Sequence, residues 1–248
     1  MLHHNCGGSQ PVSFLLQSNF YMVYNTRAIS TAILPPVLDG VSSWSHRHIA
    51  REGAGGAVVA LGPDAYVLAQ LLLSIDHRSG HRPTNKATLF LWDSRATVGK
   101  WIPEEVVLPL PADEEADTTS TTSFLADMEL ALSAYNSISF CWVDLVTGVL
   151  VYKRTADAAA ACDEARQCLQ QQESSFHFIP LPDECDAASK LMMEQRVRPK
   201  WRRSMCCVNN ETALKFVSME ACNQGIPMAD MTLSMWILEH PMSPTRWK

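Results

Sequence analysis

The chain lacks the segments that carry a protein into or across a membrane. Its first twenty residues contain no basic region followed by an apolar stretch of about 7 to 15 residues, so a secretory signal is not expected. The longest apolar run, residues 66–75, is interrupted by Gln70 and is far shorter than the ~20 residues that a membrane-spanning helix needs. We therefore expect an intracellular protein, cytoplasmic or nuclear, that makes no membrane contact.

Closely spaced metal ligands are also scarce. None of the eight cysteines forms a C-x-x-C pair, the spacing typical of structural zinc sites, and a reducing compartment disfavours disulfides. We expect free thiols that pack as small hydrophobic residues. His46 and His48, like His77 and His81, lie in polar segments beside arginines, where exposed imidazoles are common. The sequence thus predicts no metal and no cofactor.

Motifs for catalysis are missing as well. There is no G-x-S-x-G elbow, and Gly53-Ala54-Gly55-Gly56 precedes a strand-like segment, whereas a phosphate loop follows a strand and opens a helix. The segment 93–100 ends in Gly-Lys, but Trp101 stands where a phosphate loop needs Ser or Thr, so a hairpin turn is expected there. We predict no catalytic residues and no enzyme. Residues assembled only in three dimensions leave an enzyme open as an alternative.

Acidic residues outnumber basic ones, giving a formal net charge of −6. The excess is concentrated in residues 104–117, which hold six acidic residues and no Lys or Arg. Such a balance disfavours bulk binding of nucleic acid.

One basic strip runs against this trend. It is a solvated connector into a strand at 205–208, a nuclear-import signal, or a contact for nucleic acid, another anionic ligand or an acidic partner. The strip consists of Arg196, Arg198, Lys200, Trp201, Arg202 and Arg203.

The clearest structural pattern is a β-hairpin at residues 138–153. Ile138, Phe140 and Trp142 alternate on one face of a strand, and residues 149–152 form the returning strand. Between them Val146-Thr147-Gly148 provides a turn with a glycine.

Strands of this kind recur along the chain. Thr88-Leu89-Phe90-Leu91-Trp92 resembles Thr232-Leu233-Ser234-Met235-Trp236, and each is followed by a basic-Trp pair, Lys100-Trp101 or Arg246-Trp247. Two further strands end in Met22-Val23-Tyr24 and Leu150-Val151-Tyr152. Repetition of a strand, a turn and an aromatic residue is typical of stacked sheets or blades.

Three of these units end in a proline-containing segment, here called a proline exit, because proline cannot donate a main-chain hydrogen bond and so ends a strand. Pro35, Pro109 and Pro180 lie 74 and 71 residues apart, longer than the about 40 to 50 residues of a propeller blade, so insertions are expected. We predict a mainly β, partial or irregular β-propeller-like array of antiparallel hairpins, in one domain over residues 1–248, with one or two short helices. Its expected irregular parts are a disordered start at 1–11, an acidic Ser/Thr loop at 112–123, a helical or disordered insertion at 156–172 and a short helix at 186–196.

A block over residues 138–220 resembles a known family. The runs Trp142-Val143-Asp144-Leu145, Gly148-Val149-Leu150 and Phe176-His177-Phe178-Ile179-Pro180-Leu181-Pro182 are similar to the domain of unknown function 1618, a plant family expanded in grasses. The resemblance implies a β-propeller-like fold and no established activity or cofactor, and some members accompany F-box segments of ubiquitin-ligase adaptors. Its structural signature falls on Trp142, Asp144, Gly148, Phe178, Pro180 and Pro182.

Together these observations predict a non-enzymatic protein-interaction module with an unidentified protein partner. Binding of nucleic acid or an anionic ligand through residues 196–203 is the first alternative. The second is a truncated or decaying family copy without a function of its own, because the last repeated unit stops at Trp247, where a further proline exit is expected. The oligomeric state is left open by the sequence.

Overall fold

The computed structural model of the chain describes residues 21–25, 30–35, 37, 48–49, 56–62, 65–76, 82–96, 99–111, 124–134, 137–155, 175–185, 202–209, 212–221, 231–239 and 247. Most of these residues lie in strands, so the predicted mainly β class is confirmed. The segments 1–11, 112–123, 156–172 and 186–196, expected as disordered, loop or helical, lie outside the described residues.

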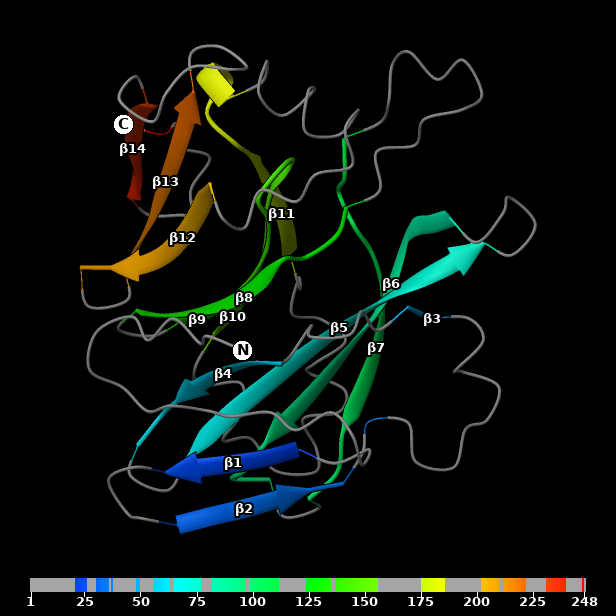
Figure 1. The fold of residues 1–248 in the computed structure, drawn as a ribbon. Coiled ribbons are helices and arrows are strands. Elements are labelled where there is room, and N and C mark those ends of the chain that lie inside the picture. Colours follow the sequence, from blue (N-terminus) through cyan, green and yellow to red (C-terminus); the bar gives the residue numbers. More distant parts are fainter. Residues whose placement is uncertain are drawn as a thin grey trace.

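Four antiparallel sheets, which we name A to D in chain order, make up the described part of the chain (Figure 1). Sheet A contains β1 (Tyr21–Asn25) and β2 (Ser30–Leu34). Sheet B contains β3 (His48–Ile49), β4 (Ala57–Ala60), β5 (Tyr66–Asp76), β6 (Arg82–Asp93) and β7 (Ile102–Val107). Sheet C contains β8 (Met128–Ala134), β9 (Ser137–Asp144), β10 (Gly148–Thr155) and β11 (Ser175–Pro180). Sheet D contains β12 (Arg203–Val208), β13 (Ala213–Ala221) and β14 (Met231–Glu239).

Each sheet is a meander in which almost every strand pairs with its neighbour in sequence. The predicted hairpin at 138–153 is confirmed, since β9 pairs with β10 and Trp142 lies opposite Leu150. Sheet B departs from the simple order only where β3 and β4 both pair with β5.

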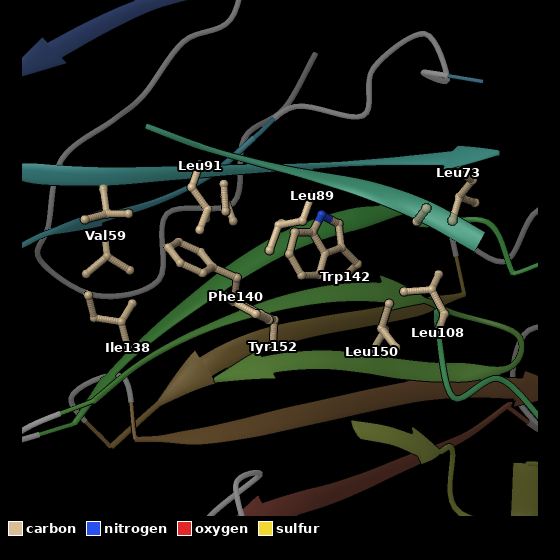
Figure 2. Close-up of a cluster of buried hydrophobic side chains, with 14 of the residues drawn as sticks. Val59, Leu73, Leu89, Leu91, Leu108, Ile138, Phe140, Trp142, Leu150 and Tyr152 are labelled. Carbon is tan, nitrogen blue, oxygen red and sulfur yellow. The ribbon is translucent and has the colours of Figure 1, made fainter. Parts of the chain in front are cut away.

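Sheets B and C pack face to face through a continuous apolar cluster (Figure 2). Leu89 and Leu91 of β6 project from sheet B, while Phe140 and Trp142 of β9 meet them from sheet C. The alternation of side chains along a strand puts every second residue on this face. The face therefore follows directly from the sequence pattern.

Two further clusters join the outer sheets to this pair. Odd-numbered residues of β9, such as Cys141 and Val143, point away from sheet B and pack against Met205 and Phe216 of sheet D. Sheet A packs on the other face of sheet B, where Tyr21 contacts Trp101 with a ring-centroid distance of 5.3 Å. Sheets B and C are thus covered on both faces, which explains why nearly all of β9 is buried.

The sheets show the antiparallel part of the fold prediction, while the propeller-like arrangement stays a prediction. The described sheets form an open stack in the order A, B, C, D, and among them no closed ring of blades is formed. Among the described residues the one helical element is a single 3-10 turn, η2 (Asp183–Cys185). The segments expected as helices, 156–172 and 186–196, lie outside the described residues. In the described part of the chain, no helix has the length and apolar character needed to cross a membrane.

The stack contains an internal repeat of two sheets, A–B and C–D. In sheet A, Tyr24 pairs with Thr31 and Met22 with Ile33; in sheet C, Tyr152 pairs with Phe176 and Leu150 with Phe178. In sheets B and D, Trp92 pairs with Leu68, and Trp236 pairs with Phe216. The recurring sequence motifs therefore occupy equivalent places in the two halves.

Two tryptophan hydrogen bonds mark the same repeat. The indole Nε1–H of Trp101 donates to the carbonyl oxygen of Pro35 at 2.8 Å, and that of Trp247 donates to the carbonyl oxygen of Pro180, also at 2.8 Å. Each bond ties the tryptophan of a basic-Trp pair to a proline exit. Tryptophan suits this role because it combines a large apolar ring with one N–H donor; Trp101 is buried and Trp247 is half-buried.

Candidate functional site

The family-like block forms the core of sheet C. Trp142 is 2% exposed and packs against Phe176 with a ring-centroid distance of 6.1 Å, while Phe178 lies opposite Leu150 on the same face. Pro180 ends β11, and Pro182 is buried just beyond it. Of these signature residues Trp142, Asp144 and Pro182 are buried, Phe178 is half-buried and Pro180 is exposed, so most of them serve the packing of sheet C.

Asp144 organises the turn after β9. Its Oδ1 accepts hydrogen bonds from the main-chain N–H groups of Val146 and Thr147 at 2.9 and 3.3 Å, and its Oδ2 accepts one from Leu125 at 2.9 Å. Asp127 completes the turn by accepting the N–H of Leu145 at 3.1 Å. Burial raises the pKa of Asp144, and the nearby carboxylate of Asp127 adds to the rise. All three bonds of Asp144 go to main-chain donors, so its role is to fix this turn.

Gly148 begins β10 directly after that turn. Its φ is +155°, and a side chain at this position would run into the main chain of β11, at the carbonyl oxygen of Ile179. Glycine is required here because β11 approaches so closely.

The structure describes only part of the basic strip. Arg196, Arg198, Lys200 and Trp201 lie outside the described residues, Arg202 is half-buried, and Arg203 is 1% exposed.

The guanidinium of Arg203 serves the fold. It donates to the carbonyl oxygens of Leu145 and Cys185 at 3.0 and 3.2 Å, and so links sheet D to the turn after β9 and to η2. Any contact of the strip with an anionic ligand therefore depends on its other residues.

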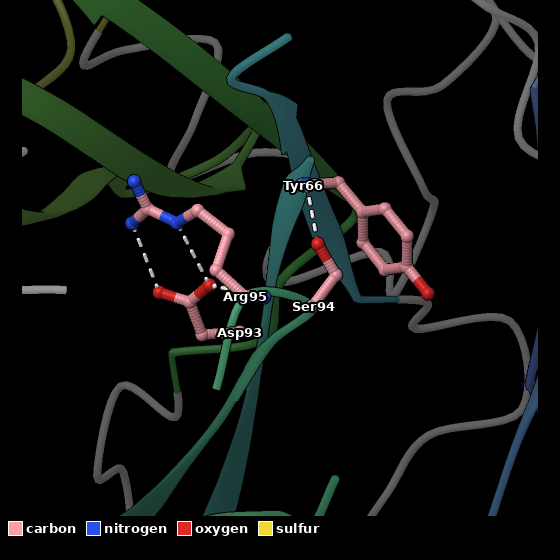
Figure 3. Close-up of polar contacts among 4 residues, drawn as sticks. All are labelled: Tyr66, Asp93, Ser94 and Arg95. Carbon is pink, nitrogen blue, oxygen red and sulfur yellow. Dashed lines mark hydrogen bonds and ion pairs between the residues drawn. The ribbon is translucent and has the colours of Figure 1, made fainter. Parts of the chain in front are cut away.

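The Gly-Lys segment after β6 is anchored as a turn (Figure 3). Asp93 accepts hydrogen bonds from the main-chain N–H and the guanidinium of Arg95, with an ion pair of 3.0 Å, and the N–H of Tyr66 donates to Ser94 Oγ at 2.8 Å. These contacts bind the turn to itself and to the start of β5. Gly53, Gly55, His46, His77 and His81 lie outside the described residues.

The edge strands β7 and β11 border an open hollow of about 520 Å³. Its lining combines two carboxylates, Glu104 and Glu105, with the ring of Phe176. Tyr152 packs against Phe176 with a ring-centroid distance of 5.0 Å. Burial, with the nearby charge of Glu104, raises the pKa of Tyr152 to about 12. This hollow is therefore an acidic, partly aromatic rim between sheets B and C.

The outer face of sheet D presents apolar side chains to solvent. Leu233 is 69% exposed and Met235 is 54% exposed, and the half-buried Val217 and Met219 lie opposite them on β13. The sequence pattern predicted a strand here but no binding role for these residues. The available signal was the alternation in Thr232-Leu233-Ser234-Met235-Trp236, which places Leu233 and Met235 on the face away from Trp236.

The outer face of sheet A is similar. Ile33 is 69% exposed and lies opposite the half-buried Met22, next to the Tyr24–Thr31 pair. Together the two outer faces form the candidate interaction surfaces, because large side chains exposed together on a sheet are typical of binding faces.

In the part of the chain that the structure describes, these features define an antiparallel β-sheet protein with apolar side chains exposed on the outer faces of sheets A and D. Residues 142–248 match the family model described as protein of unknown function (DUF1618), and the predicted family resemblance is confirmed for this part of the chain. The comparisons with curated proteins and with solved structures give no match.

Proposed function

We propose that the chain is a non-enzymatic protein-interaction module that binds its partner through the outer face of sheet D. One observation carries the proposal: Leu233 and Met235 are more than half exposed on a sheet that is firmly packed on its other face. Full burial of a Leu or Met side chain contributes about 1.5 to 3 kcal/mol. The pair is therefore a suitable centre for a protein contact.

Rigidity supports this assignment. Sheet D is held to sheet C by the buried Met205, Leu214 and Phe216, and by the hydrogen bonds of Arg203. A binding face on such a scaffold loses little conformational entropy when a partner docks. We further propose that the four sheets are consecutive blade-like units of an open, propeller-like array, since each is built from antiparallel strands, most of them neighbours in sequence, and each sheet packs on the next.

The test compares capture of proteins from cell extract by three immobilised forms of the chain. Leu233→Glu places a charge at the centre of the proposed face. Val107→Glu is the matched control, because Val107 is 65% exposed and lies on β7, away from sheet D.

Proteins retained by the wild type and by Val107→Glu but lost by Leu233→Glu are the expected result. Capture that is equal for all three forms would show that the face has no binding role. Nucleic-acid binding through residues 196–203 stays a separate prediction, and loss of affinity with rising salt would be its mark.

A further inference from the structure

The two-sheet repeat gives each exposed face a buried counterpart inside the same chain. Leu233 and Met235 of β14 are the equivalents of Leu89 and Leu91 of β6, because Trp236 and Trp92 occupy the same register against β13 and β5. Leu89 is fully buried and Leu91 is 7% exposed, since sheet C covers them. The face of sheet D that is exposed to solvent therefore corresponds to the face of sheet B that sheet C covers.

The sheet that covers sheet B also has an equivalent. Sheet A corresponds to the β10–β11 pair of sheet C, with Met22, Tyr24 and Ile33 in the places of Leu150, Tyr152 and Phe178. Those three residues of sheet C all contribute to the contact with sheet B. In sheet A, the equivalent Ile33 is 69% exposed.

The exposed face of sheet A therefore corresponds to the face of sheet C that packs on sheet B. The exposed face of sheet D corresponds to the face of sheet B in that same contact. The two exposed faces lie at opposite ends of the stack, with sheets B and C between them (Figure 1), so the chain's own sheet A does not cover its sheet D.

We propose that copies of this chain associate head to tail, the outer face of sheet D of one copy packing on the outer face of sheet A of the next. The contact reproduces between molecules the part of the B–C interface that β10 and β11 form, with Leu233 and Met235 meeting Ile33, Met22 and Tyr24. It rests on the proposed function, because it assigns a partner to the same face of sheet D. A contact between two different faces is heterologous and builds rings or open chains.

Charge does not oppose the contact. Lys215 and Glu239 lie on the outer side of sheet D in diagonal positions, Lys215 opposite Ile237 and Glu239 opposite Ala213. Opposite charges at diagonal positions on neighbouring strands offset each other. Leu233 and Met235 lie toward the other end of β14. There Arg202 is the neighbouring charge, since its carbonyl oxygen accepts the main-chain N–H of Met219, opposite Leu233, and the outer residues Met22, Tyr24 and Ile33 of sheet A bring no like charge against it.

The test uses two variants that each block one face, Leu233→Glu and Ile33→Glu, with Val107→Glu as the control. All three positions are exposed, and urea midpoints equal to that of the wild type check that the fold is kept. Molar mass is measured by sedimentation equilibrium over a range of concentrations. The wild type and Val107→Glu are expected to exceed the 27.5 kDa of the monomer as concentration rises.

Leu233→Glu alone and Ile33→Glu alone are each expected to stay monomeric at concentrations where the wild type associates, because the dissociation constant rises roughly tenfold or more. An equimolar mixture of the two is expected to form a one-to-one pair, because each variant keeps the face that the other has lost. A chain that is monomeric at every concentration overturns the proposal. It is equally overturned if the mixture does not pair, or if Leu233→Glu blocks association and Ile33→Glu does not, which indicates contact between two D faces.

The outcomes separate the two proposals. A monomeric wild type whose capture of other proteins is still abolished by Leu233→Glu removes head-to-tail association and leaves the interaction module intact. Equal capture by Leu233→Glu and Val107→Glu removes the proposed binding face itself.

Discussion

Substituting Gly148 by alanine is expected to destabilise the protein more than any other single methyl addition at a described glycine. The added Cβ would meet the carbonyl oxygen of Ile179, with Phe178 Cζ at 2.7 Å and Pro180 Cα at 3.0 Å. Two of these neighbours are main-chain atoms of β11, which cannot rotate out of the way. The substitution therefore forces β10 and β11 apart where sheet C is buried on both faces.

The expected loss follows from two contributions. Overpacking in a closely packed region costs about 1 to 3 kcal/mol. A non-glycine residue at the φ of +155° adds backbone strain, of about 1 to 3 kcal/mol. The sum, about 4 kcal/mol, is a large part of the 5 to 15 kcal/mol that roughly spans the stability of natural domains.

Urea unfolding measures the effect, with two glycines as matched controls. Gly99→Ala keeps the strain without the clash, because Gly99 has a φ of +44° and its nearest neighbour is 3.9 Å away; a loss of about 1 kcal/mol is expected. Gly62→Ala has neither problem and is expected to be nearly neutral. If the free energies of unfolding of Gly148→Ala and Gly62→Ala differ by less than about 1 kcal/mol, the steric reasoning is wrong.

Two other predictions concern buried polar groups. Arg203→Lys is expected to cost about 2 to 3 kcal/mol in urea unfolding, because a lysine cannot reach both main-chain carbonyls, while Arg202→Lys is expected to cost less than about 1 kcal/mol; equal losses would contradict the bridging role of Arg203. Tyr152 has its pKa raised to about 12, so the folded state keeps a proton that the unfolded state releases above pH 10, and stability should fall as pH rises from 10 to 12. Tyr152 lowers the free energy of unfolding by about 3 kcal/mol at most over this range, so Tyr152→Phe should lose stability more slowly as pH rises. If the free energy of unfolding falls equally with pH in both proteins, the assigned role of Tyr152 is refuted.

The strand pattern could be predicted from the sequence because it depends on neighbours along the chain. Ile138, Phe140 and Trp142 alternate, and Gly148 allows the return, so the hairpin and its register follow from local rules. The recurrence of Met22-Val23-Tyr24 in Leu150-Val151-Tyr152 was visible for the same reason. In the structure both runs carry the same cross-strand pairing.

Contacts between sheets could not be predicted in this way. Arg203 resembles an exposed member of a basic strip, yet it is buried, because the carbonyls of Leu145 and Cys185 that it needs come from distant parts of the chain. Leu233 and Leu89 have the same local pattern and differ only in what covers them. Face-to-face packing decides both cases, and a single sequence does not contain it.

The meander topology has a consequence for how the chain folds. Almost every strand pairs with the strand next to it in sequence, as from β8 to β11 and from β12 to β14, so most loops that the sheets close are short. The connection 156–174 between β10 and β11 is an exception. Closing short loops costs little entropy, and folds rich in local contacts form quickly. Each sheet can assemble as its own strands leave the ribosome, and the stack can grow from sheet A onward in the order of synthesis.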